Sequence, residues 1–305
     1  MGEDRDRTAT SNELSPADER QAREWATALA AAGIRHRLVP VGSGYVVRVP
    51  SEHAAAARLE IERFEAANVD WPPQERPVSM PTFRAPRLWA SALPSALLVF
   101  LHWWIGPFGD GALARAGACS ADALRAGEWW RVLTALTLHS GWRHLCSNVL
   151  ALLFLAHAVC GLLKAGLGWF LIVAAGACAN LCTGWLGRPG YLSVGASSAV
   201  FGALGILVAC GFVEKARRYG GLRSVWSRAW VPVTAGLGLL AFLGAAPQTD
   251  LAAHAFGFVF GGLLAVLPAL CLPRALPEWA DRLLQLATLL AVLGAWMIVL
   301  RRGVG

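Results

Sequence analysis

The sequence predicts an all-α polytopic membrane protein that carries a small α+β soluble domain at its N-terminus. Of the 305 residues, 56% are hydrophobic and only 15% are charged, whereas soluble domains usually carry about 25% charged residues. The charge is also unevenly distributed, because residues 1–78 are rich in Arg, Asp and Glu while residues 149–213 contain no acidic residue. We therefore expect a soluble α-β-β-α head over residues 1–78, a Pro-rich linker over 79–87, a six-helix membrane core over 88–272, and a cytoplasmic loop with a seventh transmembrane helix over 273–305.

Local signals predict the elements of the head. A first helix is expected to start at Ser15, a suitable N-cap, and to end at Gly33. Two β-rich runs, Ile34–Val41 and Tyr45–Val49, are joined by a Gly-Ser-Gly segment that is typical of a hairpin. A second helix should follow over Glu52–Ala67. Because so small a unit buries little apolar surface, dimerisation through the head, strand addition from a partner and contact with the membrane core are all open.

Apolar segments follow the linker at regular intervals. A helix that crosses a bilayer needs about 20 mostly apolar residues. In chain order, the seven predicted spans are Leu88–Gly106, His144–Leu163, Leu167–Leu186, Ser197–Val213, Trp230–Ala246, Leu251–Leu272 and Leu283–Leu300. The first loop, Pro107–Gly141, is long and contains tryptophans, which suits an interfacial position.

Positive charge between the apolar segments predicts the topology. The connection between the fourth and fifth spans is the most basic short loop, with charges from Lys215 to Arg228, and basic loops stay in the cytoplasm. The N-terminus and the loops that carry Lys164 and Arg274 then lie on the same side. Nearly all basic residues are Arg, and the chain is rich in Ala, Gly and Leu. This composition is typical of a GC-rich bacterial genome, so we expect a multi-pass protein of a bacterial inner membrane. The N-terminus does not match a signal peptide, so the first apolar segment should start insertion.

Composition also argues against nucleic-acid binding, metal sites and disulfide bonds. The basic residues lie at the ends of apolar segments instead of forming one stripe, so the net charge of +7 does not indicate nucleic-acid binding. The seven cysteines include no Cys-x-x-Cys pair and lie mostly in apolar runs, where thiols pack as small hydrophobes. We therefore expect no nucleic-acid partner, no metal site, no disulfide framework and no cofactor.

A serine and a histidine are the candidate catalytic pair. Polar residues at membrane depth are functional candidates because they are costly to bury. Ser197 opens the fourth span and His254 lies near the start of the sixth, so the expected topology brings both helix ends to the outer side. A serine hydroxyl needs a base to become a nucleophile, and His254 is the only histidine in the later spans. We therefore predict that Ser197 is the nucleophile and His254 its base.

Three groups are predicted to bind the oxyanion. His144 and Asn148 are four residues apart at the start of the second span, so they share one helical face. The backbone N–H of Ser197 lies at a helix N-terminus, where the helix dipole is positive. Donors aimed at a developing negative charge stabilise the transition state. Phe201, one turn after Ser197, is expected to stack on the ring of His254.

Small residues are spaced for close contact between the fourth and sixth spans. Ser198, Gly202 and Gly205 form a stripe on one helix, and Gly257 and Gly261 form a matching face on the other. Such faces let helix backbones approach closely, which a hydrogen bond between short Ser and His side chains requires.

These motifs, in this order, resemble those of the rhomboid family of intramembrane serine proteases. The matching residues are Trp130-Arg131 in the first loop, His139, His144 and Asn148 at the second span, Gly195-Ala196-Ser197 at the fourth, and His254, Gly257 and Gly261 at the sixth. The resemblance covers residues 88–272 and implies a six-helix rhomboid-like bundle, to which the seventh helix is an addition that the family includes. It further implies a partnership with the lipid bilayer and cleavage of the transmembrane segments of membrane-protein substrates by a Ser–His dyad without a third carboxylate.

Two features depart from the family pattern. The residue after the nucleophile is usually Gly, whereas Ser198 adds a second hydroxyl that is able to reposition the oxyanion-binding groups. An acidic residue that is usual near the end of the second span is also absent.

Several of these residues also admit a structural interpretation. His139 is expected to shape the first loop through hydrogen bonds rather than to catalyse. For Asn148 the alternative to the oxyanion role is an interhelical hydrogen-bonding role. Asp250, four residues before His254, would complete a triad, but a helix cap is the better interpretation. The pair Trp129-Trp130 is expected to anchor the loop at the interface.

Three other protein classes are alternatives. A metalloprotease using His139, His144, Cys146 and His254 as ligands is disfavoured because no His-Glu-x-x-His motif occurs. A transporter should show repeats and interrupted helices, which the sequence lacks. The main alternative is a non-catalytic rhomboid-like protein that binds or escorts membrane clients, although such relatives typically lose the Ser or the His.

Overall fold

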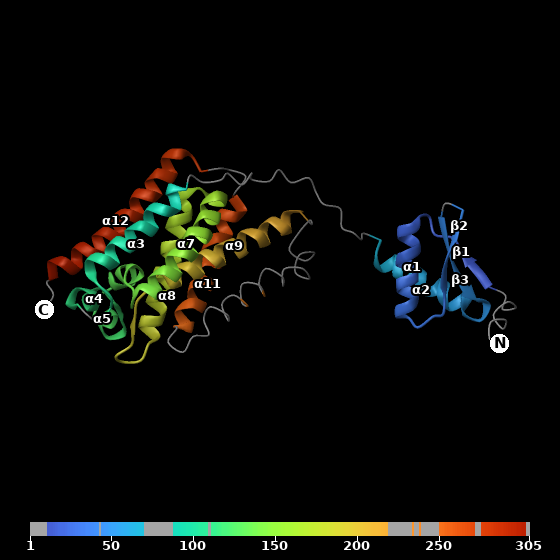
Figure 1. Cartoon of the computed structure of the whole chain (residues 1–305), viewed down its shortest axis with the longest axis horizontal. Coiled ribbons are helices and arrows are strands. Elements are labelled where there is room, and N and C mark those ends of the chain that lie inside the picture. The colour runs from blue at the N-terminus through green and yellow to red at the C-terminus, as the bar shows by residue number, and fades with distance from the viewer. Residues whose placement is uncertain are drawn as a thin grey trace. The chain divides into compact units, whose positions relative to one another are not determined.

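The computed structural model describes residues 11–42, 44–69, 88–108, 111–218, 234, 238, 250–271 and 276–302. The chain divides into two compact units, residues 1–75 and 76–305, and each is described by itself (Figure 1). The linker expected over 79–87 lies outside the described residues.

The first unit is a three-stranded antiparallel sheet with two helices. Its elements are β1 (Ser11–Leu14), α1 (Glu19–Ala31), β2 (Arg37–Val41), β3 (Gly44–Pro50), the 3-10 turn η1 (Ser51–His53) and α2 (Ala54–Ala67). The strand order is β1-β3-β2, with β3 in the centre. The predicted helix–strand–strand–helix order is present, and β1 is an additional strand that the sequence did not predict.

The start of α1 differs from the expectation. Asp18 is the N-cap, because its carboxylate accepts a hydrogen bond from the backbone N–H of Gln21 at 2.7 Å, which is a preferred capping arrangement. The predicted cap at Ser15 is therefore wrong. The core of this unit consists of Leu29, Val47, Val49, Ala57 and Ile61.

The second unit is a helical bundle. Its long helices are α3 (Trp89–Ile105), α7 (Trp142–Leu163), α8 (Ala165–Leu186), α9 (Ser197–Arg218), α11 (Leu251–Cys271) and α12 (Glu278–Arg302). Five of these, α7, α8, α9, α11 and α12, are long and apolar enough to cross a membrane, while α3 is a shorter apolar helix of 17 residues. The predicted span Trp230–Ala246 lies outside the described residues, apart from positions 234 and 238.

Exposed tryptophans gather at the two ends of the bundle. Trp103 and Trp104 lie at the end of α3, Trp142 begins α7 and Trp185 is near the end of α8. Because consecutive spans run in opposite directions, these four positions share one end, and Trp279 at the start of α12 belongs to the other. Tryptophans at both interfaces are typical of membrane proteins. The described helices therefore belong to a multi-pass membrane protein.

The loop between α3 and α7 has its own structure. It contains α4 (Ala112–Gly117), β4 (Cys119–Ser120), α5 (Ala121–Arg125), α6 (Arg131–Thr134) and the 3-10 turn η2 (Ala135–Thr137). Strand β4 pairs antiparallel with β5 (Leu192–Ser193), which lies between α8 and α9. The pairing joins this first loop to the segment that leads into α9.

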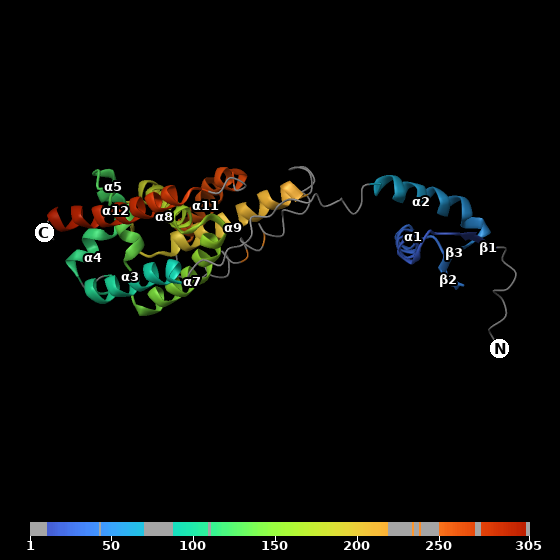
Figure 2. The same ribbon diagram turned by 90° about the horizontal axis from the view of Figure 1, so that it is seen from above.

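Helix α9 lies in the interior of the bundle, where it contacts α7, α8 and α11 (Figure 2). Helix α12 extends along α8, and its C-terminal end lies near α4 (Figure 1, Figure 2). The start of α9 is thus surrounded by other helices on one side and by the first loop on the other.

Candidate active site

Gly195 lies between the side chains of Ser197 and His144. Its φ angle is +135°, a backbone conformation that favours glycine. A Cβ atom placed on Gly195 would lie 2.6 Å from Cε1 and 2.8 Å from Nε2 of His144, and 3.6 Å from Oγ of Ser197. The absence of a side chain at Gly195 therefore allows the imidazole and the serine hydroxyl to converge.

The hydrogen bonds of His144 indicate which ring nitrogen carries the proton. Its Nδ1 atom lies 3.1 Å from the hydroxyl oxygen of Ser140 and accepts a hydrogen bond from the backbone N–H of Ser140 at 3.5 Å. A backbone N–H only donates, so Nδ1 acts as the acceptor and, in the neutral ring, Nε2 bears the hydrogen. Since Nε2 faces Gly195, His144 directs a donor toward the side of Ser197. Ser140 was not among the predicted site residues.

Asn148 lies one turn further along α7. Its side chain is 5% exposed, and its amide nitrogen donates a hydrogen bond to the backbone carbonyl of His144 at 3.0 Å. Among the described residues, no hydrogen bond joins Asn148 to Ser197. The amide has a second N–H, which is the group that an oxyanion would use.

His254 lies in the first turn of α11 and is 5% exposed. Its ring stacks on that of Phe201, with centroids 4.4 Å apart and an interplanar angle of 29°, as the spacing of Phe201 from Ser197 predicts. Within the described part of the chain, Nδ1 of His254 has no hydrogen-bond partner, and no hydrogen bond joins the ring to Ser197. Catalytic hydrogen bonds are often long before substrate binds.

Asp250 caps α11 instead of completing a triad. Its carboxylate accepts a hydrogen bond from the backbone N–H of Ala253 at 3.0 Å, and its carbonyl accepts one from the N–H of His254 at 3.1 Å. The hydroxyl of Tyr191 also donates to this carboxylate. Because Tyr191 precedes β5, this contact ties the start of α11 to the segment that leads into Ser197.

Glycines bring the backbones of α9 and α11 into direct contact. A Cβ atom on Gly257 would lie 2.2 Å from the carbonyl oxygen of Ser198, and one on Gly261 would lie 2.0 Å from that of Gly202. On α9, a Cβ atom on Gly205 would lie 2.0 Å from the carbonyl oxygen of Phe258. The close approach predicted from the small residues is therefore confirmed at three positions along α9, from Ser198 to Gly205.

The hydroxyl of Ser198 is held by a neighbouring helix. Ser198 is 2% exposed and donates a hydrogen bond to Oδ1 of Asn180 at 3.2 Å. The amide nitrogen of Asn180 in turn donates to the carbonyl of Val132 at 2.9 Å. Asn180 was not among the predicted site residues, although a polar residue in the interior of a span is the signal that would have identified it.

His139 supports the backbone that precedes Ser197. Its side chain is 0% exposed, and its Nε2 atom accepts a hydrogen bond from the N–H of Ala196 at 3.4 Å. Burial lowers the pKa of His139 to about 3, with the neighbouring histidines contributing in the same direction, so the ring is neutral and able to accept. The N–H of Gly195 donates to the carbonyl of Ala135 at 2.9 Å. Residues 135–139 of the first loop therefore fix the segment that leads into α9.

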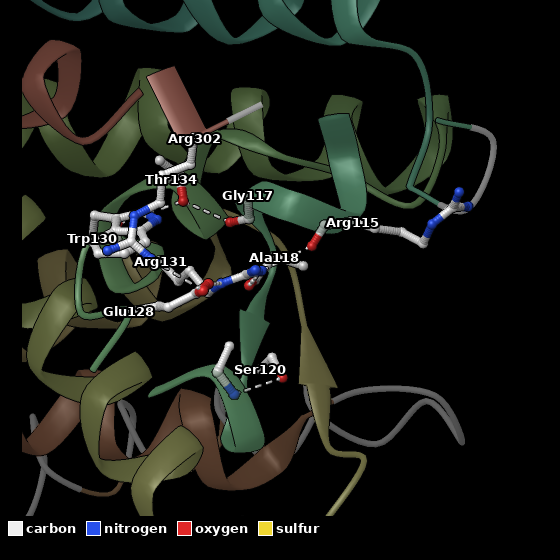
Figure 3. Close-up of polar contacts among 10 residues, drawn as sticks. Arg115, Gly117, Ala118, Ser120, Glu128, Trp130, Arg131, Thr134 and Arg302 are labelled. Carbon is white, nitrogen blue, oxygen red and sulfur yellow. Dashed lines mark hydrogen bonds and ion pairs between the residues drawn. The ribbon is translucent and has the colours of Figure 1, made fainter. Parts of the chain in front are cut away.

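Arg131 organises the first loop from its interior (Figure 3). Its guanidinium donates hydrogen bonds to the carbonyls of Arg115 at 2.9 Å and Ala118 at 3.0 Å, and it pairs with Glu128 at 2.6 Å. Of the tryptophan pair expected at the interface, Trp129 is 59% exposed, but Trp130 is only 4% exposed. The prediction for Trp130 is wrong because this ring packs inside the loop cluster.

An apolar cavity of about 370 Å³ lies between α3, α8 and α12. It reaches Ala196 and Ala199 at the start of α9 but is lined by neither Ser197 nor His254. Within the described residues, no group of three His, Cys, Asp or Glu side chains is arranged to hold a metal ion.

Comparisons with known proteins agree on one family. Residues 126–270 match the family model of the rhomboid domain. The chain is 34% identical to rhomboid protease GluP of Bacillus subtilis over 180 residues, which are 59% of this chain and 33% of that protein. It is 32% identical to the rhomboid relative YdcA of the same organism over 143 residues, which are 46% of this chain and 68% of YdcA. RHOMBOID-like protein 1 of Arabidopsis thaliana is 30% identical over 143 residues, 45% of this chain and 34% of that protein. The match thus spans about a third of the length of GluP.

Proposed function

The chain belongs to the rhomboid family of membrane proteins, and from this premise we propose that it is an intramembrane serine endopeptidase. The observation that carries the proposal is the convergence of Ser197 and His144 at Gly195, beside a helix whose first turn presents His254. A nucleophile, a base and an oxyanion donor are the three groups that peptide-bond hydrolysis needs.

In the proposed mechanism, Ser197 and His254 act as a dyad. Oγ of Ser197 attacks the scissile carbonyl carbon while His254 removes the hydroxyl proton, and the imidazolium then returns that proton to the leaving amine. Water repeats the same steps on the acyl-enzyme. The stack on Phe201 fixes the plane of the His254 ring.

The oxyanion would be stabilised by three donors. These are Nε2–H of His144, the backbone N–H of Ser197 and the free amide N–H of Asn148. The acceptor contact of His144 with Ser140 favours the required tautomer, and the start of α9 adds the positive end of the helix dipole. Asn148 would have to turn its second N–H toward the site.

The surroundings of the two adjacent serines favour Ser197 as the nucleophile. Ser198 is 2% exposed and its hydroxyl is already engaged with Asn180. Ser197 is partly exposed, and its hydroxyl faces the gap beside Gly195 where His144 lies. A scissile bond must reach the hydroxyl that attacks it, which disfavours the enclosed residue.

The proposed substrates are membrane proteins, which the enzyme would cleave within their transmembrane segments in the lipid bilayer. We place the N-terminus in the cytoplasm of a bacterial cell, with the inner membrane as the location, because the most basic loop falls on the same side as the head. For the head we propose a role in assembly, including dimerisation, because none of the catalytic candidates lies in it.

A fluorophosphonate probe on the purified protein tests this function. We expect the probe to label the wild-type protein and Ser198→Ala but not Ser197→Ala. Ser197→Ala and His254→Ala should each abolish cleavage of a transmembrane substrate while the melting temperature stays near that of the wild type. Members of one catalytic unit are not additive, so the double variant should be no worse than either single variant. A wild-type protein that is neither labelled nor active would instead favour the non-catalytic client-binding role.

A further inference from the structure

Helix α12 is anchored at its start to the turn between α7 and α8. Nζ of Lys164 lies 2.7 Å from the carboxylate of Glu278, and Oδ1 of Asp281 accepts a hydrogen bond from the N–H of Leu167 at 3.1 Å. Asp281 is only 5% exposed, so this carboxylate serves as a cap for α8 in a position shielded from solvent. The first turn of α12 is therefore specifically attached to the bundle.

The far end of α12 contacts the first loop. Trp296 is 7% exposed, and its indole N–H donates a hydrogen bond to the hydroxyl of Thr137 at 3.0 Å. The same ring lies so close to Gly117 that a Cβ atom there would be 2.9 Å from it. Together with Ala295 and Val299, the indole forms a buried cluster with loop residues that include Trp130.

The last turn of α12 adds a charged contact to the same loop. The guanidinium of Arg302 lies 4.2 Å from the centre of the Trp130 ring and 3.5 Å from the carboxylate of Glu128 (Figure 3). Glu128 also pairs with Arg131. An Arg over a Trp face is attracted by the ring quadrupole, so Arg302 contacts both Trp130 and Glu128, and Glu128 is shared between Arg302 and Arg131.

Thr137 connects these contacts to the nucleophile. It is the last residue of η2, the turn whose Ala135 carbonyl accepts the N–H of Gly195. Two residues later, His139 accepts the N–H of Ala196. The indole of α12 therefore bonds to the short segment that holds the two residues before Ser197.

From this arrangement we infer that α12 is a brace for the nucleophile. Trp296 is a positioning residue that acts through Thr137 on the backbone before Ser197, and Arg302 steadies the loop from which that turn extends. A helix that served only to contact lipid would not direct a buried indole N–H and a guanidinium at the loop. The inference deepens the proposed function, because the geometry that it protects is that of Ser197 and its oxyanion donors.

Trp296→Phe removes the indole N–H together with the part of the ring that lies against Gly117. We expect kcat to fall at least about fivefold to tenfold, the amount for which one buried hydrogen bond accounts, while KM stays unchanged because α12 does not touch the nucleophile directly. Trp279→Phe makes the same chemical change on the same helix at a residue that is 67% exposed, and it should leave kcat unchanged. At the C-terminal end, Arg302→Lys should lower kcat about twofold to threefold and Arg301→Lys should not.

Thr137 provides the second half of the test. Thr137→Val removes the hydroxyl that accepts the indole N–H and donates to the carbonyl of Thr134 at 2.7 Å, so it should lower kcat at least as much as loss of the indole N–H does. Thr137→Ser keeps the hydroxyl and should keep kcat near that of the wild type. Because Trp296 acts through the Thr137 hydroxyl, Trp296→Phe combined with Thr137→Val should fall well short of additive losses. Fully additive losses, or equal kcat values for Trp296→Phe and Trp279→Phe, would overturn the inference.

Hydrogen exchange separates failure of the brace from failure of the proposed function. We expect the amides of residues 194–198 to exchange faster in full-length Trp296→Phe than in the wild type or Trp279→Phe. If Ser197→Ala retains cleavage, the proposed function fails, while faster exchange in Trp296→Phe still supports the brace. Unchanged exchange in Trp296→Phe, measured on protein with a normal melting temperature, would overturn the brace whatever the activity.

Discussion

Two regions of the membrane unit hold the candidate catalytic groups by different physical means. The α9–α11 contact relies on glycines, with backbone atoms of one helix in the space where a Cβ atom of the other would lie. The contact of the first loop with α9 and α12 relies on hydrogen bonds, ion pairs and aromatic rings. The first region positions Ser197 relative to His254, and the second positions the backbone that leads into Ser197.

The two arrangements should respond differently to substitution. A contact between backbones has no flexible atoms that are able to move aside, so one added methyl group must separate the helices. The polar network divides its stabilisation among many bonds worth about 1 kcal/mol each, so loss of one bond should weaken it gradually. Matched substitutions in each region test this difference.

Gly261→Ala should have the largest effect. Its Cβ atom would lie 2.0 Å from the carbonyl oxygen of Gly202, so we expect a loss of about 3 kcal/mol of stability and no measurable cleavage. The matched control is Gly262→Ala, whose nearest contact would be 3.7 Å away and which should be neutral. Thermal unfolding in detergent and a cleavage assay provide the readouts. Equal melting temperatures for the two variants would show that the helices adjust more readily than the contact suggests.

Gly195→Ala comes next, at the junction of the two regions. The added Cβ atom would lie 2.6 Å from the His144 ring, so the ring must move away from Ser197. We expect kcat to fall about 10²–10³-fold, the usual effect of losing an oxyanion donor, with less change in KM. Stability should also fall by about 1–3 kcal/mol, because alanine is strained at the φ of +135°. Gly141→Ala, where a Cβ atom would meet nothing within 4 Å, is the control. A rise in KM alone would argue against an oxyanion role for His144.

Arg131→Lys tests the polar network. A lysine cannot reproduce the planar donors that reach the carbonyls of Arg115 and Ala118, so stability should fall by about 1–3 kcal/mol and kcat several-fold. Arg143→Lys, on an exposed residue at the start of α7, should change neither quantity. If Arg131→Lys abolished activity as Gly261→Ala does, the loop would be as intolerant as the helix contact.

Ser198→Gly should have a smaller effect. Removal of the hydroxyl loses the hydrogen bond to Asn180, and glycine lowers helix propensity, so we expect a loss of about 1–2 kcal/mol in stability. Activity should be kept or raised, because the proposed nucleophile Ser197 and its proposed oxyanion donors are untouched. Loss of activity in Ser198→Gly together with retention in Ser197→Ala would identify Ser198 as the nucleophile instead.

Removal of the head should have the smallest effect. Neither region uses residues of the first unit, so a protein that starts near Pro81 should cleave at a rate close to that of the full chain in detergent. The rate of substrate cleavage by the two proteins, compared at equal concentration, tests this. A well-folded but inactive truncated protein would assign the head a direct part in cleavage.

The membrane helices follow from the sequence because one local property, apolarity, determines them. The predicted His144–Leu163 and Leu251–Leu272 differ by at most two residues from α7 and α11. Helix α12 begins five residues before the predicted start at Leu283. The prediction began too late because Glu278 and Asp281 are charged and do not suit a membrane span by themselves. In the structure, both carboxylates have partners at the turn between α7 and α8.

Contacts between distant segments account for what the sequence did not predict. The stack of Phe201 on His254 follows from helical spacing, but the bond between Thr137 and Trp296 joins residues that no periodicity relates. The same holds for Ser198 and Asn180, whose pairing gives the unusual hydroxyl a partner. Trp130 is an example of a position whose burial could not be predicted from the sequence. Tryptophan suits both a membrane interface and the core of a loop, and only the surrounding structure shows that Trp130 lies in the core.

The position of α12 in the chain also bears on when a new molecule becomes active. A ribosome completes Ser197 and His254 before it begins α12, and the roughly 50 residues from His254 to Arg302 take about 2–10 s to synthesise. During that interval the nascent chain holds the proposed nucleophile and base, but Thr137 still lacks its indole partner. Under the proposed function, full turnover would therefore arrive only once α12 is in place.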